Sequence, residues 1–505
     1  MGIIVDLIII LIFFACIYGG YKRGLANCLL KVLTSVLAII IALVLYKPFV
    51  NFIIQSTTID DNIALSLEKI IYQNSNNNSE NNNEKVIDDN SEIPKPIAKY
   101  INSNVKNSID EKKAEAISEA SKNAAVLIVN IVGVIIIYII AKILLKISLV
   151  WGISLSFYHI YKILKRNPNK IETAIFIFLI LTLLLTLIFY RNTTNLKTWI
   201  INLIFMTGIF YIDKDKPKEN IEKDIYIMSS LFSIFMFITF LISAILYTQR
   251  TSEMTEFEIL YGKVWGLFVY KNSLAISAGI AFLLSIFCFL KSKKKAFKYF
   301  FLLNTIIQLI AVFVSKGRSA ILLLLAIPFV FLFVQFKNKI FRTSIIIIPS
   351  VFCVLGFALF HEKLGAFLSG RQELWYSAWL LIKKNLFVGV GNEALVEKVY
   401  SMRPNVILPG IEMGRLHNIL LQLITENGVF SLIIFLIILY LSFSKLVSKV
   451  HTLSGKNALV QKVLLSLVVG LVFVNLFESN LIYLVSFIAI TFWTYLGYFL
   501  SLNEK

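Results

Sequence analysis

The chain has 505 residues, of which 58% are hydrophobic, and its formal net charge is +19. Apolar runs of about 16 to 25 residues recur along its whole length, which excludes an ordinary soluble globular protein and predicts an all-α polytopic membrane protein. The lysines sit in short loops between these runs, so the charge favours a signal for membrane orientation over nucleic-acid binding.

The apolar runs predict about thirteen transmembrane helices. The segment 147–161 is ambiguous, because it can either extend the third span or lie along the membrane interface. The predicted spans, in chain order, are 3–20, 27–54, 123–146, 171–190, 198–212, 225–247, 271–290, 299–314, 320–336, 343–360, 416–441, 462–478 and 483–500.

The distribution of lysine and arginine predicts how these spans cross a bacterial cytoplasmic membrane. With the N-terminus outside and the C-terminus cytoplasmic, the cytoplasmic loops hold 23 Lys and Arg in 79 residues, and the short outer loops hold 6 in 40. Cytoplasmic loops are the ones that carry excess positive charge. The run KSKKK at 291–295 is the strongest anchor, although it could also touch acidic lipid heads.

Two long loops then fall outside the membrane. The first, 55–122, contains the polar low-complexity run NSNNNSENNNEK and is expected to be a flexible tether that ends in an exposed helix. The second, 361–415, has Gly, Trp and Arg at intervals and little low complexity. A loop this long is either disordered or functional, and its composition favours function.

Charged residues are sparse at the centres of the predicted spans, where a transporter would place them. Asp6 lies near a helix end, and Lys142 and Lys146 can extend their amines to the interface. Pro328 and Pro349 can kink two helices, but there is no matching pair of broken segments in two halves of the chain. The pattern makes a transporter the weaker hypothesis without excluding it.

Basic residues converge on the predicted outer face against the usual orientation bias. The hairpin SKGRSA carries Lys316 and Arg318, the segment SGRQELW carries Arg371 and Trp375, and GRLHN opens the next span at the end of the large loop. Any one of these charges alone could be a tolerated interfacial residue. Together they predict an anion site, in which arginine can bridge two phosphate oxygens.

His417 is the candidate base of this site. A neutral imidazole can take a proton from an attacking hydroxyl, and the adjacent Arg415 disfavours the charged imidazolium. Alone, the histidine would more simply be a residue at a helix entrance. The sequence has no His/Cys/Asp cluster with metal-ligand spacing and no phosphate-binding glycine loop, so metal-independent chemistry without a cofactor is expected.

The order of these motifs resembles the bacterial O-antigen ligase and polymerase superfamily, over about 171–500. In that family a His, then Asn, Ser or Arg, then nine intervening residues and a Gly open a helix after a large outer loop; His417, Asn418 and Gly428 match this pattern. The other matching motifs are Gly370–Arg371 with Trp375, NLFVGVG at 385–391 with Leu386 where proline is usual, the Ser315–Arg318 hairpin, and YKNSLA at 270–275.

The resemblance implies transfer of an undecaprenyl-diphosphate-linked glycan to a hydroxyl acceptor, in a helical bundle like that of membrane glycosyltransferases of type C. By position, His417 would be the base, and Arg318 and Arg371 would hold the diphosphate. Asn418 and Trp375 would contact substrate, and Gly428 would pack the helix. Arg415 and Lys316 are added to the substrate site from their charge alone.

The first 165 residues resemble a different family, the colicin V production proteins. The resemblance rests on a span that starts with Asp6, a turn GYKRG at 20–24 and a second long span, with 123–146 as a possible third. The last span of that family is not evident in 147–161. The role that this implies for 1–165 is no more than docking of partner proteins or a link to secretion.

The interpretation of the whole chain is a surface-polysaccharide glycosyltransferase with a fused helper module. The residue usage resembles that of an AT-rich bacterial genome, which suggests a source without lipopolysaccharide. A polymerase for capsule or exopolysaccharide is therefore favoured over a ligase. The alternatives are a transporter or flippase of lipid-linked glycan, and a scaffold whose acidic loop 55–122 recruits other polysaccharide assembly proteins. Membrane lipids are expected partners in each case.

Overall fold

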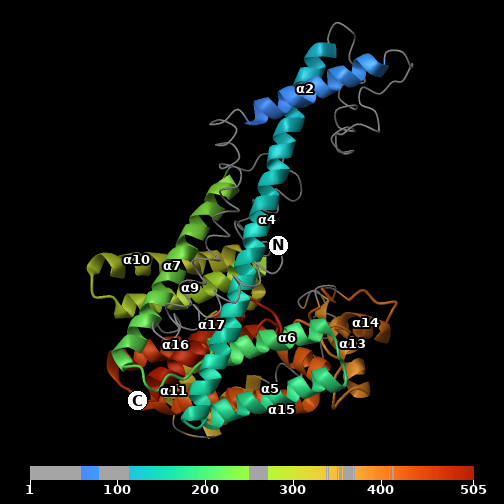
Figure 1. Cartoon of the computed structure of the whole chain (residues 1–505). Coiled ribbons are helices and arrows are strands. Elements are labelled where there is room, and N and C mark those ends of the chain that lie inside the picture. The colour runs from blue at the N-terminus through green and yellow to red at the C-terminus, as the bar shows by residue number, and fades with distance from the viewer. Residues whose placement is uncertain are drawn as a thin grey trace. The chain divides into compact units, whose positions relative to one another are not determined.

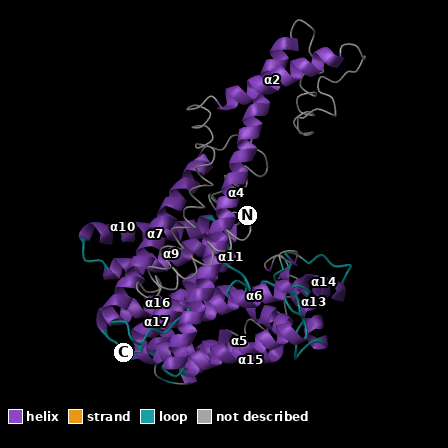
Figure 2. Cartoon of the chain, in the orientation of Figure 1, coloured by secondary structure: helices purple, strands orange, loops and turns teal. Residues whose placement is uncertain are grey.

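The computed structural model describes residues 59–78, 113–248, 271–336, 338, 340–349, 351, 355, 368, 370–408, 410–411 and 414–504. Within these residues the secondary structure is helical, with no strand, as Figure 2 shows. The predicted all-α polytopic membrane fold is confirmed. The predicted spans 3–20 and 27–54 lie outside the described residues.

The chain divides into two compact units, and the described part of the first comprises residues 59–78 and 113–150. Helix α2 (Ile59–Asn78) replaces the first part of the expected flexible tether, because its first half has the apolar spacing of a helix and buries Ala64 and Leu67. Residues 79–112 of that expected tether lie outside the described residues. Helix α4 (Lys113–Lys165) contains the expected helix near 108–125, but its small residues, such as Ala120 and Ala124, are buried rather than exposed.

The ambiguous segment 147–161 is part of α4, which continues through it without a break and so extends the helix of the third span. From Trp151 onward α4 belongs to the second unit. There the ring of His159 stacks on that of Tyr211 at 4.0 Å between centroids, and its Nδ1 lies 2.9 Å from the carbonyl oxygen of Thr207.

The other helices that the structure describes in the second unit are shown in Figure 1. They are α5 (Lys170–Ile188), α6 (Thr193–Leu203), the π-helical turn η2 (Ile204–Ile209), α7 (Lys218–Thr248), α9 (Lys271–Lys291), α10 (Lys295–Val314), α11 (Arg318–Gln335), α13 (Arg371–Lys384), α14 (Leu395–Met402), α15 (Ile419–His451), α16 (Gly455–Asn475) and α17 (Phe487–Asn503).

Seven helices among the described residues are long and apolar enough to cross a membrane: α5, α7, α9, α10, α11, α15 and α16. Apolar helix α17, at 17 residues, is shorter. The predicted span 198–212 is formed by α6 and η2 together, and half of 343–360 lies outside the described residues. The multi-pass character is therefore confirmed, and the number thirteen stays a prediction.

Helix α9 is the most enclosed of these seven, and it packs against α7, α10, α11 and α16. Small residues permit this close packing: a Cβ on Gly279 would lie 2.8 Å from a methyl carbon of Leu323 on α11, and a Cβ on Gly470 of α16 would meet the same leucine at 2.9 Å. Lipid tails are as apolar as leucine, so close van der Waals packing at small residues is what holds such helices together.

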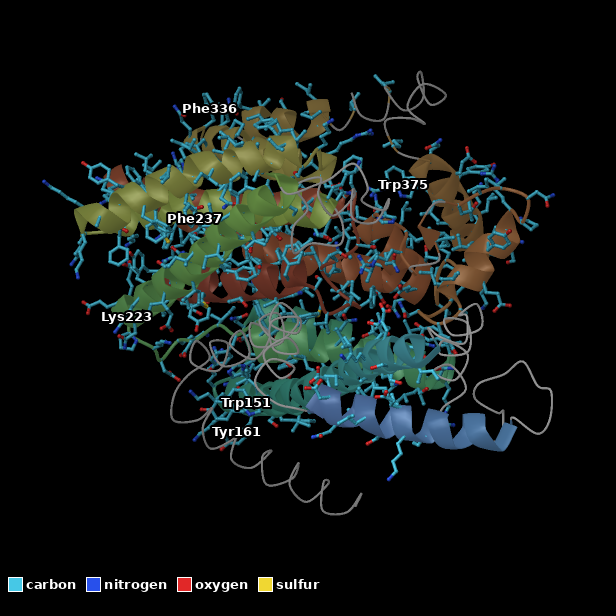
Figure 3. All side chains as sticks on the ribbon, turned by 90° about the horizontal axis from the view of Figure 1, so that it is seen from above. Trp151, Tyr161, Lys223, Phe237, Phe336 and Trp375 are labelled. Carbon is cyan, nitrogen blue, oxygen red and sulfur yellow. The ribbon has the colours of Figure 1, made fainter. Side chains whose placement is uncertain are left out.

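One end of this bundle carries the residues of the predicted site. The first residues of α9, α11 and α15 and the last residues of α16 meet there, while the lysine run 291–295 lies at the opposite end of α9. In Figure 3, Trp375 of α13 and Lys223 of α7 likewise lie on opposite sides of the second unit.

Helix α15 is broken at Gly428, and the loop NLFVGVG enters the break. Gly428 has φ 75° and ψ 175°, a conformation accessible to glycine but not to other residues without strain. The loop and the opened helix exchange backbone hydrogen bonds: Val390 N–H to the Thr425 oxygen at 2.9 Å, Gly391 N–H to the Glu426 oxygen at 3.0 Å, and Val429 N–H to the Leu386 oxygen at 2.8 Å. Gly428 thus lets a loop pair with a helix, which is more than the helix packing expected of it.

We expect Gly428→Ala to destabilise the protein strongly, because its Cβ would lie 2.1 Å from the Phe387 carbonyl oxygen. Gly455→Ala is the matched control, since Gly455 also has a positive φ of 61° but no atom within 4 Å of its Cβ position. The control should cost about 1–2 kcal/mol for the left-handed backbone alone. Thermal unfolding of the purified variants in detergent measures both, and equal losses for the two variants would contradict the steric role of Gly428.

Candidate functional site

The centre of the site is Glu478, a buried acidic residue in the segment that joins α16 to α17. Its Oε1 accepts hydrogen bonds from Ser319 Oγ at 3.1 Å and from Asn272 Nδ2 at 3.4 Å. Arg371 Nη2 also lies 3.4 Å from Oε1, and His417 Nδ1 lies 3.2 Å from Oε2. Four chain segments that are far apart in the sequence therefore converge on one carboxylate.

His417 enters this site at the start of α15. Asn418 is the N-cap of that helix, and its Oδ1 accepts from the N–H groups of Leu420 and Leu421, each at 3.0 Å. Its Nδ2 donates to the Leu476 carbonyl at 3.0 Å, which ties the helix start to the end of α16. Asn418 is therefore a helix cap in this geometry, and contact with substrate stays a prediction.

Only one tautomer of neutral His417 fits this arrangement. An ionised carboxylate can only accept a hydrogen bond, so the proton must sit on Nδ1 and point at Glu478. The other ring nitrogen, Nε2, is then a bare acceptor, and it faces Gly410, where a Cβ would lie 2.7 Å away. The imidazole is arranged to take a proton at Nε2.

Arg371 is the first residue of α13, after Gly370 in the left-handed conformation. Its Nη1 donates to the carbonyl of Phe477 while Nη2 faces Glu478, so the guanidinium is held between neighbouring backbone and side-chain oxygens. Trp375, one turn further along, donates from Nε1 to the Leu416 carbonyl at 2.7 Å. The indole thus holds the backbone next to His417.

Lys316 and Arg318 lie on the hairpin that joins α10 to α11, and both side chains are exposed. Lys316 has φ 54°, a left-handed turn conformation, and Ser319 directly after Arg318 bonds Glu478. Arg415 is half-buried and donates from Nη1 to Asn480 Oδ1 at 2.7 Å, two residues beyond Glu478. The structure therefore brings the predicted residues of all three outer segments to one end of the bundle.

The positive groups around Glu478 keep its carboxylate ionised. Burial alone would raise the pKa of Glu478, but the hydrogen bond with His417 and the charge of Arg371 outweigh it and lower the pKa below its ordinary value. A permanent negative charge then offsets Arg371 and orients His417.

Glu478, Asn272 and Ser319 were missed as site residues in the sequence. Glu478 offered one signal, since it is the sole charged residue in the short outer loop 478–482 between two apolar spans. A second missed carboxylate, Glu426, lies inside α15 and is 1% exposed. It is an exception among the predicted span centres, where charged residues are sparse, and it is held by the amides of Gln422 and Asn392.

These contacts join an imidazole that can accept a proton at Nε2, a carboxylate that orients it and the guanidinium of Arg371. A hydroxyl held near Nε2 can lose its proton to His417 as it attacks, because Glu478 stabilises the imidazolium that forms. A leaving group that gains negative charge can be stabilised by guanidinium and ammonium groups. Among the described residues there is no cluster of His, Cys, Asp and Glu suited to a metal ion.

Comparison with known families agrees with this geometry: residues 303–436 match the family model of O-antigen ligase. Residues 303–436, called the O-antigen ligase segment below, are thus similar to that family. The O-antigen ligase segment includes Lys316, Arg318, Arg371, His417 and the break at Gly428, whereas Glu478 lies beyond its end. Residues 5–73 match a second family model, colicin V production protein. No curated protein matches the chain.

Both predicted resemblances are thus confirmed, over shorter ranges than 171–500 and 1–165. The O-antigen ligase segment and the apolar helices together indicate an O-antigen ligase or polymerase type of membrane protein, and they point to the inner membrane.

We expect Glu478→Gln to release both Arg371 and His417. The variant should lose about 100-fold or more in activity, because a misplaced base costs about that much, whereas Ser319→Ala should lose far less.

The lowered pKa of Glu478 also predicts how the stability of the protein depends on pH. Stability from Glu478 is present above its unfolded pKa and is lost as pH falls through the lower folded pKa.

Thermal midpoints measured from neutral pH down through the acidic range would show this. The wild-type protein should lose stability on acidification, and Glu478→Gln should lack that component. An identical pH dependence in the two proteins would count against an ionised, charge-paired Glu478.

Proposed function

We propose that the protein is a membrane glycosyltransferase that acts on undecaprenyl-diphosphate-linked oligosaccharide repeat units on the outer face of the cytoplasmic membrane, in surface polysaccharide biosynthesis. The observation that carries the proposal is the shared carboxylate of Glu478, which orients His417 at 3.2 Å and Arg371 at 3.4 Å. This pairs a base for an acceptor hydroxyl with a cation for a leaving diphosphate.

The proposed reaction is a single displacement at the sugar carbon that carries the diphosphate. The acceptor oxygen attacks that carbon, its proton passes to Nε2 of His417, and the bond between the carbon and the diphosphate oxygen breaks with its electron pair on the oxygen. Arg318, Arg371 and Lys316 stabilise the growing negative charge. We propose that no metal is required, so activity should persist when EDTA is added.

Arg415 and Trp375 support this reaction indirectly in our proposal. Arg415 adds positive charge to the site and fixes Asn480, and Trp375 holds the Leu416 carbonyl. The acceptor is a hydroxyl group of a glycan or a lipid, and we propose a polymerase of capsule or exopolysaccharide units rather than a ligase. The orientation with the site outside follows from the lysine distribution.

The domain arrangement forms part of the same proposal. Residues 171–500 would be the catalytic membrane domain with the outer loop 361–415, and residues 1–165 would be a helper module that contacts other polysaccharide assembly proteins. The match of residues 5–73 to the colicin V production family supports a separate origin for that module.

His417→Ala should abolish glycan chain growth in cells, with a loss of about 10²–10⁴-fold if the imidazole acts as general base. His451→Ala is the matched control, because His451 lies at the other end of α15 and contacts the Val334 carbonyl. Gel analysis of extracted glycan gives chain length, and immunoblotting gives the amount of protein in the membrane. Normal chain length in a normally abundant His417→Ala variant would sink the proposal.

Arg371→Ala should lose about 10²–10³-fold, the range for removing one group that stabilises transition-state charge. Arg403→Ala is its control, since Arg403 belongs to the same outer region and pairs with Glu373 at 2.6 Å. The same gels compare both variants with the wild-type protein, and similar chain lengths in the two variants would argue against a role for Arg371.

A deletion strain separates the two forms of the proposed activity. Single repeat units in that strain indicate a lost polymerase, and free long chains indicate a lost ligase.

A further inference from the structure

Gln422 lies one turn inside α15 and is 3% exposed, and its side-chain amide turns back toward the loop that carries His417. Its Oε1 accepts from the Leu416 N–H at 2.7 Å, and its Nε2 donates to the Gly414 carbonyl at 3.1 Å. These two backbone groups lie on either side of Arg415. One side chain therefore holds both ends of the short stretch that leads into His417.

The backbone from Gly414 to His417 adopts a strained conformation. Gly414 has φ 70° and His417 has φ 50°, so a residue with a Cβ occupies the left-handed region directly beside the site. Such a conformation costs free energy and persists where surrounding contacts determine it. Between these residues, Leu416 is fully buried, and its carbonyl accepts from Trp375, which fixes the stretch from a third direction.

Glu426 determines which way the Gln422 amide faces. Its Oε1 accepts from Gln422 Nε2 and, at 3.0 Å, from Asn392 Nδ2. Because Glu426 Oε1 acts as an acceptor for Asn392 as well, it pairs with the NH2 end of the Gln422 amide, and the amide oxygen is left to face the Leu416 N–H. Asn392 directly follows Gly391, which donates to the Glu426 carbonyl. The contact network thus runs from the break in α15 to His417.

We propose that Gln422 is a positioning residue for glycosyl transfer and that Glu426 sets its orientation. Gln422 holds the backbone from Gly414 to Leu416 so that the His417 and Arg415 side chains meet Glu478 and Asn480. Neither Gln422 nor Glu426 needs to touch the substrate for this role. The inference rests on the proposed function and names residues that the base depends on.

The test uses the purified full-length protein in liposomes, with lipid-linked glycan extracted from cells that lack this protein as the substrate. In the variant Gln422→Met, the methionine side chain is about as long as glutamine but lacks the amide group that makes the hydrogen bonds. We expect it to lower kcat about 100-fold, since small displacements of a catalytic group cost that much. KM for the donor should change far less than kcat, because Arg318 and Arg371 are untouched.

Gln461→Met is the matched control, because Gln461 is a buried glutamine on α16 at the end of the bundle opposite the site. It should leave kcat unchanged. A loss of kcat in Gln422→Met that Gln461→Met reproduces would overturn the inference, and so would a loss that appears entirely in KM.

A pair of variants keeps the inference testable if Gln422→Met does not fold. Gln422→Glu keeps the acceptor for the Leu416 N–H but places a second carboxylate beside Glu426, so kcat should fall. The double variant Gln422→Glu with Glu426→Gln restores a donor and an acceptor between the two positions. It should recover at least about tenfold of the lost kcat, the effect of about one hydrogen bond. No recovery would contradict the orienting role of Glu426.

Failure of this inference can be told from failure of the proposed function. If His417→Ala loses transfer while Gln422→Met keeps its kcat, only the positioning role falls. If His417→Ala retains transfer in the same assay, the proposed function itself is wrong.

Discussion

A buried carboxylate beside an apolar bundle has to be paired, and pairing Glu478 is the constraint on which the rest of this site depends. An uncompensated charge at such a position costs several kcal/mol, so α9, α11, α13 and α15 each bring a polar group to it. The same four contacts that neutralise the carboxylate also place Arg371 and His417 at one end of the bundle. Stability and the geometry of the site therefore have a common origin.

The second constraint is the break in α15. A continuous helix would leave no backbone donors and acceptors for the loop 385–391, whereas the opened turn at Gly428 offers them. Unpaired backbone groups are costly in an apolar surrounding, so loop and helix each satisfy the other. The glycine eleven residues after His417 is thus explained by backbone pairing, and the loop residue Asn392 carries that pairing on to Glu426 and Gln422.

The sequence predicted the features that depend on composition and local spacing. Apolar runs predicted the all-helical membrane fold, and the positions of Lys316, Arg318, Arg371 and His417 beside helix ends predicted that they belong to one end of the bundle. It could not predict Glu478 as their centre, because a carboxylate in a short loop gives no sign of which side chains will reach it through space. The break at Gly428 was not predicted for a related reason, because a left-handed turn inside a helix depends on the tertiary contacts that pair with it.

The most direct measurement is the stoichiometry of the proposed reaction with purified protein in liposomes. Lipid-linked repeat units are supplied in the presence of EDTA, and both the undecaprenyl diphosphate released and the glycosidic bonds formed are counted. The account predicts one diphosphate released for each bond formed by the wild-type protein and neither product from His417→Ala. Movement of intact lipid-linked glycan across the bilayer without release of diphosphate would contradict it.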